Sequence, residues 1–79
     1  QGFVNIAAIY RLQNDYKKEL CYINRALKID PNNPQFLFDR AKVNLNLNDK
    51  INARKDITRV LELQPESVEA KELLNSIKY

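Results

Sequence analysis

Histidine, tryptophan and methionine are absent from this chain of 79 residues, and glycine and cysteine each occur once. A single cysteine cannot form a disulfide within the chain, and the lack of histidine excludes His/Cys zinc sites and histidine-based catalysis. One glycine is too few for a loop that cradles phosphate groups. No stretch approaches the about 18 consecutive apolar residues of a membrane span. We therefore expect no metal site, no cofactor, no small-molecule substrate and no enzymatic activity. No compartment is indicated, with the cytoplasm slightly favoured.

Positive and negative charges are nearly balanced along the chain. Thirteen Lys and Arg residues against ten Asp and Glu residues leave a net charge of +3, which is too small to indicate nucleic-acid binding by itself. Hydrophobic residues make up 44% and charged residues 29%, as in ordinary folded domains, and 79 residues suffice for one small domain. The absence of methionine and of a charged-then-apolar leader predicts a fragment of a longer protein.

The sequence repeats itself with a period of 34 residues. A shift of 34 aligns eight identical pairs within the 45 overlapping positions, where average residue usage gives about three by chance. The identical pairs are Gln1/Gln35, Ala7/Ala41, Asn14/Asn48, Asp15/Asp49, Ile23/Ile57, Arg25/Arg59, Leu27/Leu61 and Pro31/Pro65. A fixed period of this length indicates stacked copies of one structural unit.

Each copy of the repeat predicts two helices. In the first copy, apolar residues recur at helical spacing over residues 3–10 and again over residues 16–27. Asn14-Asp15 separates the two stretches, because Asn and Asp favour turns and helix N-caps. The segment 30–34 ends the second helix, since its prolines disfavour a helical residue before them and the Asn32-Asn33 pair tolerates left-handed backbone.

The second copy shows the same pattern from Pro34 to about Leu63, with Asn48-Asp49 as its inner turn. Gln64-Pro65 ends its second helix, and a fifth helix is predicted from Ser67, which is a favourable N-cap residue. No strand is needed anywhere, so these five helices predict an all-α fold.

The repeat unit resembles the tetratricopeptide repeat, a helix-turn-helix of 34 residues with conserved bulky, small, aromatic and proline positions. The matching residues are Phe3, Ala7, Tyr10, Asp15-Tyr16, Ala26 and Asp30-Pro31 in the first copy, and Leu37, Ala41, Asp49, Ala53, Val60 and Pro65 in the second. The chain departs from the pattern at Glu19, Asn44 and Lys50, where the other copy has Ala53, Tyr10 and Tyr16.

The resemblance covers essentially the whole chain and implies an α-α superhelix, or solenoid, formed by one domain of residues 1–79. Repeat one is expected at about residues 1–33, repeat two at about 34–67, and a capping helix at about 67–79.

A comparison of the two copies predicts one specific contact. Ile6 in the first copy corresponds to Arg40 in the second, and Tyr22 corresponds to Asp56. Both members of a facing pair thus change from apolar to oppositely charged, and a partly buried arginine seldom lacks a partner. We expect Arg40 to contact Asp56 between the third and fourth helices. The alternative is two unrelated surface charges.

The two ends of the repeat array are expected to differ. The fifth helix has an apolar stripe suited to packing on the preceding repeat, formed by Ala70, Leu73, Leu74 and Ile77, and a polar side formed by Lys71, Asn75 and Lys78. A polar outer side is typical of a terminal cap. Ile9 corresponds to Val43, which should pack on the preceding helix, but no helix of this chain precedes the first one to cover Ile9. We expect further repeats upstream in the parent protein, or self-association through this end.

The family resemblance implies a binding surface on the concave side, lined by the first helix of each repeat. The residues implied there are Val4, Ala8, Arg11, Leu12, Phe38, Lys42, Leu45, Asn46 and Tyr79, with Glu72 and Ser76 beside them. The apolar members offer contact area, and the basic members can meet a carboxylate. Phe38 and Leu45 fit equally well a role in packing the third helix against its neighbours.

Chaperone-binding members of the family clamp a terminal carboxylate with lysine and asparagine side chains. The corresponding positions here include Val4, Ala8 and Asp39, so this activity is not predicted. Cys21 has no histidine neighbour and is expected to be an inert thiol.

Three functions remain open from the sequence. A protein-interaction module or scaffold segment that binds a peptide or partner protein on its concave face is favoured, by analogy with the family. A structural or self-associating segment without a groove ligand comes second, and it would form a concentration-dependent dimer. An RNA-binding helical repeat comes third, because two units could read only about two bases.

Overall fold

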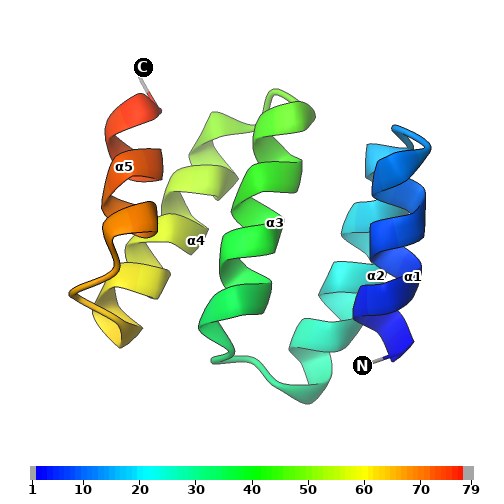
Figure 1. Cartoon of the computed structure of the whole chain (residues 1–79), viewed down its shortest axis with the longest axis horizontal. Helices are drawn as coiled ribbons and strands as arrows, with labels where there is room; N and C mark the ends of the chain where they lie inside the picture. Colours follow the sequence, from blue (N-terminus) through cyan, green and yellow to red (C-terminus); the bar gives the residue numbers. More distant parts are fainter. Residues whose placement is uncertain (1, 78–79) are drawn as a thin grey trace.

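The computed structural model describes residues 2–77, and this part of the chain consists of five α-helices without a β-strand (Figure 1). The helices are α1 (Gly2–Leu12), α2 (Tyr16–Ile29), α3 (Pro34–Asn46), α4 (Lys50–Leu63) and α5 (Val68–Ser76). The predicted all-α fold is confirmed. The last helix is shorter than expected, because Ile77 is its C-cap with extended backbone at ψ 109°. Lys78 and Tyr79 lie outside the described residues.

Four of the five helices begin at a polar residue that caps them. In each case a side-chain oxygen accepts a hydrogen bond from the backbone N–H three residues later, which satisfies one of the otherwise unpaired donors of the first turn. The donor–acceptor distances are 3.3 Å at Asp15, 3.1 Å at Asn33, 3.1 Å at Asp49 and 3.2 Å at Ser67. Local chemistry therefore sets where these helices start.

The turn inside each copy contains an asparagine in left-handed conformation. Asn14 has a φ of 59° and Asn48, 34 residues later, has a φ of 63°. Asparagine tolerates this region better than other residues with a side chain. Asn33 also tolerates left-handed backbone but does not adopt it here, since its φ is −74° and its side chain caps α3.

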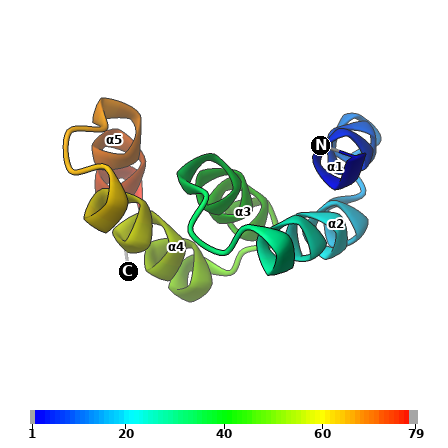
Figure 2. The same cartoon turned by 90° about the horizontal axis from the view of Figure 1, so that it is seen from below.

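The helices form a curved double layer. Figure 2 shows α1, α3 and α5 along the inner side of the curve, with α2 and α4 along its outer side. Several equivalent positions of the two copies are buried alike, as seen for Ala7 and Ala41 and for Ile23 and Ile57. The buried apolar core comprises Ala7, Ile23, Ala26, Leu27, Phe36, Leu37, Ala41, Val43, Ala53, Ile57, Val60, Ala70 and Ile77.

The contact predicted between Arg40 and Asp56 is confirmed. The Arg40 Nε atom donates to Asp56 Oδ2 and its Nη2 atom donates to Asp56 Oδ1, both at 2.8 Å. The Nη1 atom of Arg40 also donates to Asn24 Oδ1 at 2.9 Å, so the guanidinium joins α2, α3 and α4. This two-point pair supplies hydrogen bonds to the buried carboxylate of Asp56.

The two ends of the array differ as expected. On α1, the Ile9 side chain is 54% exposed, whereas its counterpart Val43 is 2% exposed. At the other end, Ala70 of α5 is fully buried while Lys71 and Asn75 are exposed. The apolar face of α1 is thus uncovered in this chain, and α5 presents a polar side.

Candidate functional site

The concave face is formed by α1, α3 and α5, which lie in front in Figure 1. The residues expected on it divide into two groups. The half-buried group is Val4, Ala8, Phe38 and Leu45, and the exposed group is Arg11, Leu12, Lys42, Asn46, Glu72 and Ser76. Tyr79, the remaining expected residue, lies outside the described residues.

Phe38 and Leu45 pack against the hydrophobic core while keeping part of their side chains exposed. The packing role that the sequence left open for them is therefore present. The Nζ atom of Lys42 lies 5.3 Å from the centre of the Phe38 ring, a cation–π distance that holds the ammonium group close to α3.

A hollow of about 370 Å³ opens where the end of α1 meets α2 and α3. It is lined by Arg11, Glu19, Asp39, Lys42, Val43, Leu45 and Asn46. Arg11, Lys42, Leu45 and Asn46 are the four of these residues that were expected on the concave face. Arg11 and Lys42 are basic and lie on α1 and α3, the first helices of the two repeats. Sequence reasoning did not place Glu19 and Asp39 in the site.

Glu19 is the unusual member of this hollow. It is only 1% exposed, at the position where the second copy has the fully buried Ala53. Its Oε2 atom is 3.9 Å from the Arg11 Nη1 atom, and its Oε1 atom has no hydrogen-bond partner among the described residues. Burial raises the pKa of Glu19, an effect that Arg11 and Lys42 oppose and Asp39 reinforces. A charged residue at a small, buried repeat position was the sequence signal for it.

The consequence for the site is electrostatic. Glu19 lies behind the exposed guanidinium of Arg11 and favours its position beside the hollow. Asp39 is engaged within α3, where its Oδ1 atom accepts a hydrogen bond from Gln35 Nε2 at 3.0 Å. The basic groups of Arg11 and Lys42 are the exposed charges at the mouth of the hollow.

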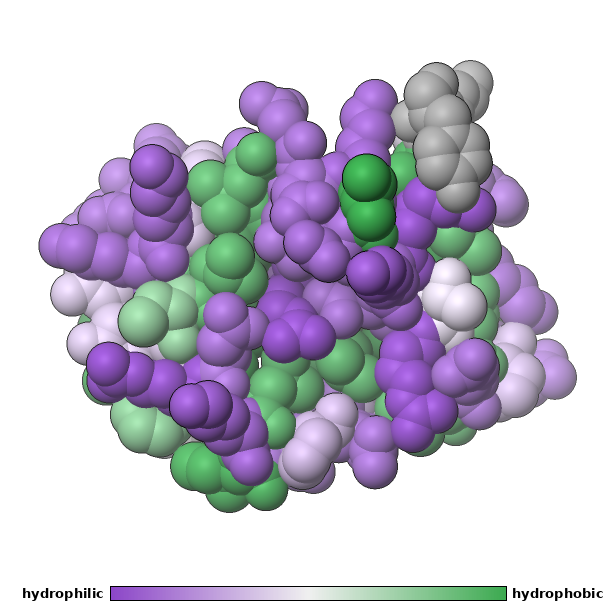
Figure 3. Space-filling model, turned by 180° about the vertical axis from the view of Figure 1, so that it is seen from behind, coloured by the Kyte–Doolittle hydropathy of each residue, from purple (hydrophilic) through white to green (hydrophobic). Residues whose placement is uncertain are grey.

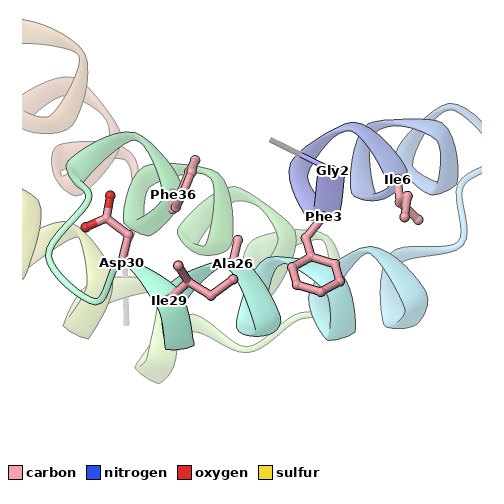
Figure 4. A pocket seen from close by; sticks show the side chains of 7 residues that line it. All are labelled: Gly2, Phe3, Ile6, Ala26, Ile29, Asp30 and Phe36. Atoms are coloured by element: carbon pink, nitrogen blue, oxygen red, sulfur yellow. The ribbon is translucent and has the colours of Figure 1, made fainter.

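A second, more apolar hollow of about 490 Å³ lies where the first turns of α1 and α3 approach the end of α2. Figure 4 shows its lining side chains on three different helices and the following turn. They are Gly2, Phe3, Ile6, Ala26, Ile29, Asp30 and Phe36. Sequence reasoning missed this hollow, because it forms between elements that only the packing brings together.

Three further features of residues 2–77 concern metal binding, the single cysteine and membrane-spanning character. No group of three His, Cys, Asp or Glu residues in that range is placed to hold a metal ion. Cys21 is a free, exposed thiol. None of the described helices combines the length and apolar character that crossing a membrane requires.

Comparison with known proteins agrees with this architecture. The 36% identity to a UPF0162 protein of Xylella fastidiosa (strain 9a5c) extends over 61 residues, which are 77% of this chain and 22% of that protein. The 33% identity to FK506-binding protein 59 of Drosophila melanogaster also extends over 61 residues, 77% of this chain and 14% of that protein. The matched stretch thus spans less than a quarter of either relative.

The sequence model of the family described as Tetratricopeptide repeat matches residues 6–77, which includes nearly all of the described helical structure. Repeats of this family are typically non-catalytic protein-interaction modules. Together with the paired helices and their 34-residue period, this match establishes that the chain belongs to the tetratricopeptide repeat family.

Proposed function

We propose that this chain binds a peptide segment of a partner protein on its concave face. The observation that carries the proposal is the hollow between consecutive repeats, where the exposed basic groups of Arg11 and Lys42 lie beside partly exposed apolar surface of Leu45. Such a combination suits a peptide that presents an apolar side chain next to a carboxylate.

Two features support this assignment. Arg11 has a buried carboxylate behind it, so its guanidinium is held near the hollow without being covered. The ammonium group of Lys42 is held over the Phe38 ring. Part of the binding surface is therefore already in position before a ligand arrives, which lowers the entropy cost of binding.

The experiment is a selection from a phage-displayed peptide library on the folded chain, followed by calorimetry with the selected peptides. The double variant Arg11→Ala/Lys42→Ala removes the two basic groups of the hollow. We expect it to weaken binding about tenfold or more, since each charge-assisted hydrogen bond is worth on the order of 1.5 kcal/mol.

The matched control is Lys50→Ala/Lys55→Ala, which removes the same charge from exposed positions of α4 in the convex layer. This variant should bind the selected peptides nearly as well as the unmodified chain, and circular dichroism should show both variants folded. Equal binding by the concave variant and the unmodified chain would contradict the proposal.

Self-association is the second candidate function, and the exposed apolar face of α1 favours it. Ile9 is 54% and Leu12 is 82% exposed on that helix. If this face pairs two copies, sedimentation at two protein concentrations will show a dimer that Ile9→Lys abolishes. A monomer at both concentrations would rule out self-association.

A further inference from the structure

The convex layer carries a group of exposed basic residues on α2. We call Lys17, Lys18, Arg25 and Lys28 the basic edge. In an α-helix these positions fall within about 100° of arc and extend over about 16 Å. Within α2 the acidic residue is Glu19, which is buried on the other side of the helix, and the N-cap residue Asp15 has its Oδ2 atom 3.8 Å from Lys18 Nζ. Figure 3 looks onto the convex layer, where hydrophilic side chains predominate.

Arg25 lies on an aromatic surface at the centre of the basic edge. Its guanidinium carbon is 4.9 Å from the centre of the Tyr22 ring and 6.0 Å from that of Phe3. Tyr22 in turn stacks on Tyr10 at 5.7 Å, and the Lys18 Nζ atom lies 5.4 Å from the Tyr10 ring centre. Contact with ring faces positions a guanidinium while leaving its N–H donors available for an acceptor.

The second repeat provides an internal comparison, because Arg59 corresponds to Arg25. The Nη1 atom of Arg59 donates to Glu62 Oε1 at 3.0 Å, and its Nη2 atom donates to Asn32 Oδ1 at 2.9 Å. Glu62 is three residues after Arg59, and the corresponding residue, three after Arg25, is Lys28. No hydrogen bond or ion pair joins Arg25 to another residue in the range 2–77. The acceptor that Arg59 finds in Glu62 is thus replaced beside Arg25 by the positive charge of Lys28.

We propose that the basic edge docks an acidic segment of a partner protein, with Arg25 as the anchor that binds an Asp or Glu carboxylate. The lysines on either side add attraction along the helix. A length of about 16 Å corresponds to about five residues of extended chain. The surface is separate from the concave face, so this docking site does not depend on the peptide-binding function proposed above.

Two observations favour a protein segment over a nucleic acid. Proteins that hold single strands offer open aromatic faces on which bases stack. Here Tyr10 and Tyr22 stack on each other and also contact the cations of Lys18 and Arg25. The net charge of +3 is also small for a protein that binds a phosphate backbone.

The test uses the 79-residue chain and a fluorescein-labelled peptide of six glutamates, with binding followed by fluorescence anisotropy at low salt. Arg25→Gln should weaken binding about fivefold or more, because it removes the anchoring charge-assisted pair. Arg59→Gln removes the same charge from the equivalent position of the second repeat and should change binding by less than about twofold. Arg25→Lys keeps the charge without the planar fork and should fall between them.

Three results would overturn the proposal. Equal losses for Arg25→Gln and Arg59→Gln would show attraction by net charge alone. Tighter binding of a labelled oligouridylate, with the same dependence on Arg25, would identify a nucleic-acid site. A concentration-dependent dimer in sedimentation that Arg25→Gln abolishes would identify a second copy of this chain as the occupant. Should Arg25→Gln fail to fold by circular dichroism, a loss of about threefold with Arg25→Lys supports the proposal, and no loss overturns it.

Discussion

Glu19 and Asp56 are both buried carboxylates on the second helix of a repeat, but their surroundings differ. Asp56 accepts two hydrogen bonds from Arg40 at 2.8 Å. Glu19 has a single cation at 3.9 Å and an oxygen without a hydrogen-bond partner among the described residues. A buried charge is tolerated at little cost only when its hydrogen-bonding capacity is used. The two residues therefore lead to opposite expectations for mutation.

Removal of Arg40 should destabilise the fold. Arg40→Ala leaves the carboxylate of Asp56 buried and unpaired, and we expect a loss of about 2–3 kcal/mol in the free energy of unfolding. The double variant Arg40→Ile/Asp56→Tyr introduces the apolar pair found in the first repeat and should come within about 1 kcal/mol of the unmodified chain. Urea denaturation measures both. A double variant as unstable as Arg40→Ala would contradict the idea that these pairs are equivalent solutions.

Glu19 should make stability depend on pH. Burial raises the pKa of Glu19 above its ordinary value of 4.5 in the folded state. The folded state then holds this proton more tightly than the unfolded state, so the contribution of Glu19 to stability is complete below pH 4.5 and is lost as the pH rises through the folded pKa. Glu19→Gln removes this dependence.

Thermal melts from acidic to neutral pH provide the measurement. The melting temperature of Glu19→Gln relative to the unmodified chain should increase as the pH rises, because only the unmodified chain then buries a charge. The matched control is Glu66→Gln, which removes one negative charge from an exposed position. A difference in melting temperature that stays constant over this pH range would rule out the proposed effect of burial on Glu19.

At the scale of the helices, capping residues set where α2, α3, α4 and α5 begin. The junction between the two repeats depends on Asn33, whose side chain caps α3, and on Pro34, which follows as the first residue of that helix. Proline at this position is favourable because its missing N–H would have no partner there anyway. This junction therefore sets the start of the second repeat.

Loss of the Asn33 cap should weaken α3. We expect Asn33→Ala to lower the free energy of unfolding by about 1 kcal/mol, since the backbone N–H of Phe36 loses its acceptor. Asn33→Asp retains an acceptor oxygen at the same place. Its free energy of unfolding should remain within about a few tenths of a kcal/mol of that of the unmodified chain. Urea denaturation of the two variants decides the matter, and equal stability of both would show that the cap contributes nothing.

At the scale of the whole molecule, stability depends on contacts between neighbouring helices along a line. The stability of such an array is approximately the sum of the stabilities of its repeats and of the interfaces between neighbouring repeats. Leu27 lies in α2, the helix of the first hairpin that packs on α3 of the second, and is 6% exposed. Its counterpart Leu61 in α4 is only partly buried.

Truncation at these two positions should therefore have unequal effects. We expect Leu27→Ala to cost about 2–5 kcal/mol, which is enough to unfold a domain of this size, because it opens a cavity in the buried core. Leu61→Ala should cost less, since part of its side chain is already in contact with solvent. Circular dichroism during chemical denaturation measures both, and a larger effect at Leu61 would contradict this account.

Several features could be predicted because they depend on residues close together in sequence or on differences between the copies. The Asn14-Asp15 and Asn48-Asp49 turns were recognisable from residue types that favour them. The Arg40–Asp56 pair was recognisable because both positions change together relative to Ile6 and Tyr22. The apolar hollow at α1, α2 and α3 was not recognisable, since its lining depends on how three helices approach one another.

The amino-acid sequence alone determined the number of helices, their starts and the repeat of the unit, because turn residues, caps and hydrophobic spacing act over a few residues. Only the tertiary structure decided which residues of different helices meet. Phe3 of α1, Ala26 of α2 and Phe36 of α3 line one hollow, and Arg59 of α4 donates to Asn32 in the turn between the repeats. These contacts depend on distances between helices, which no local pattern specifies.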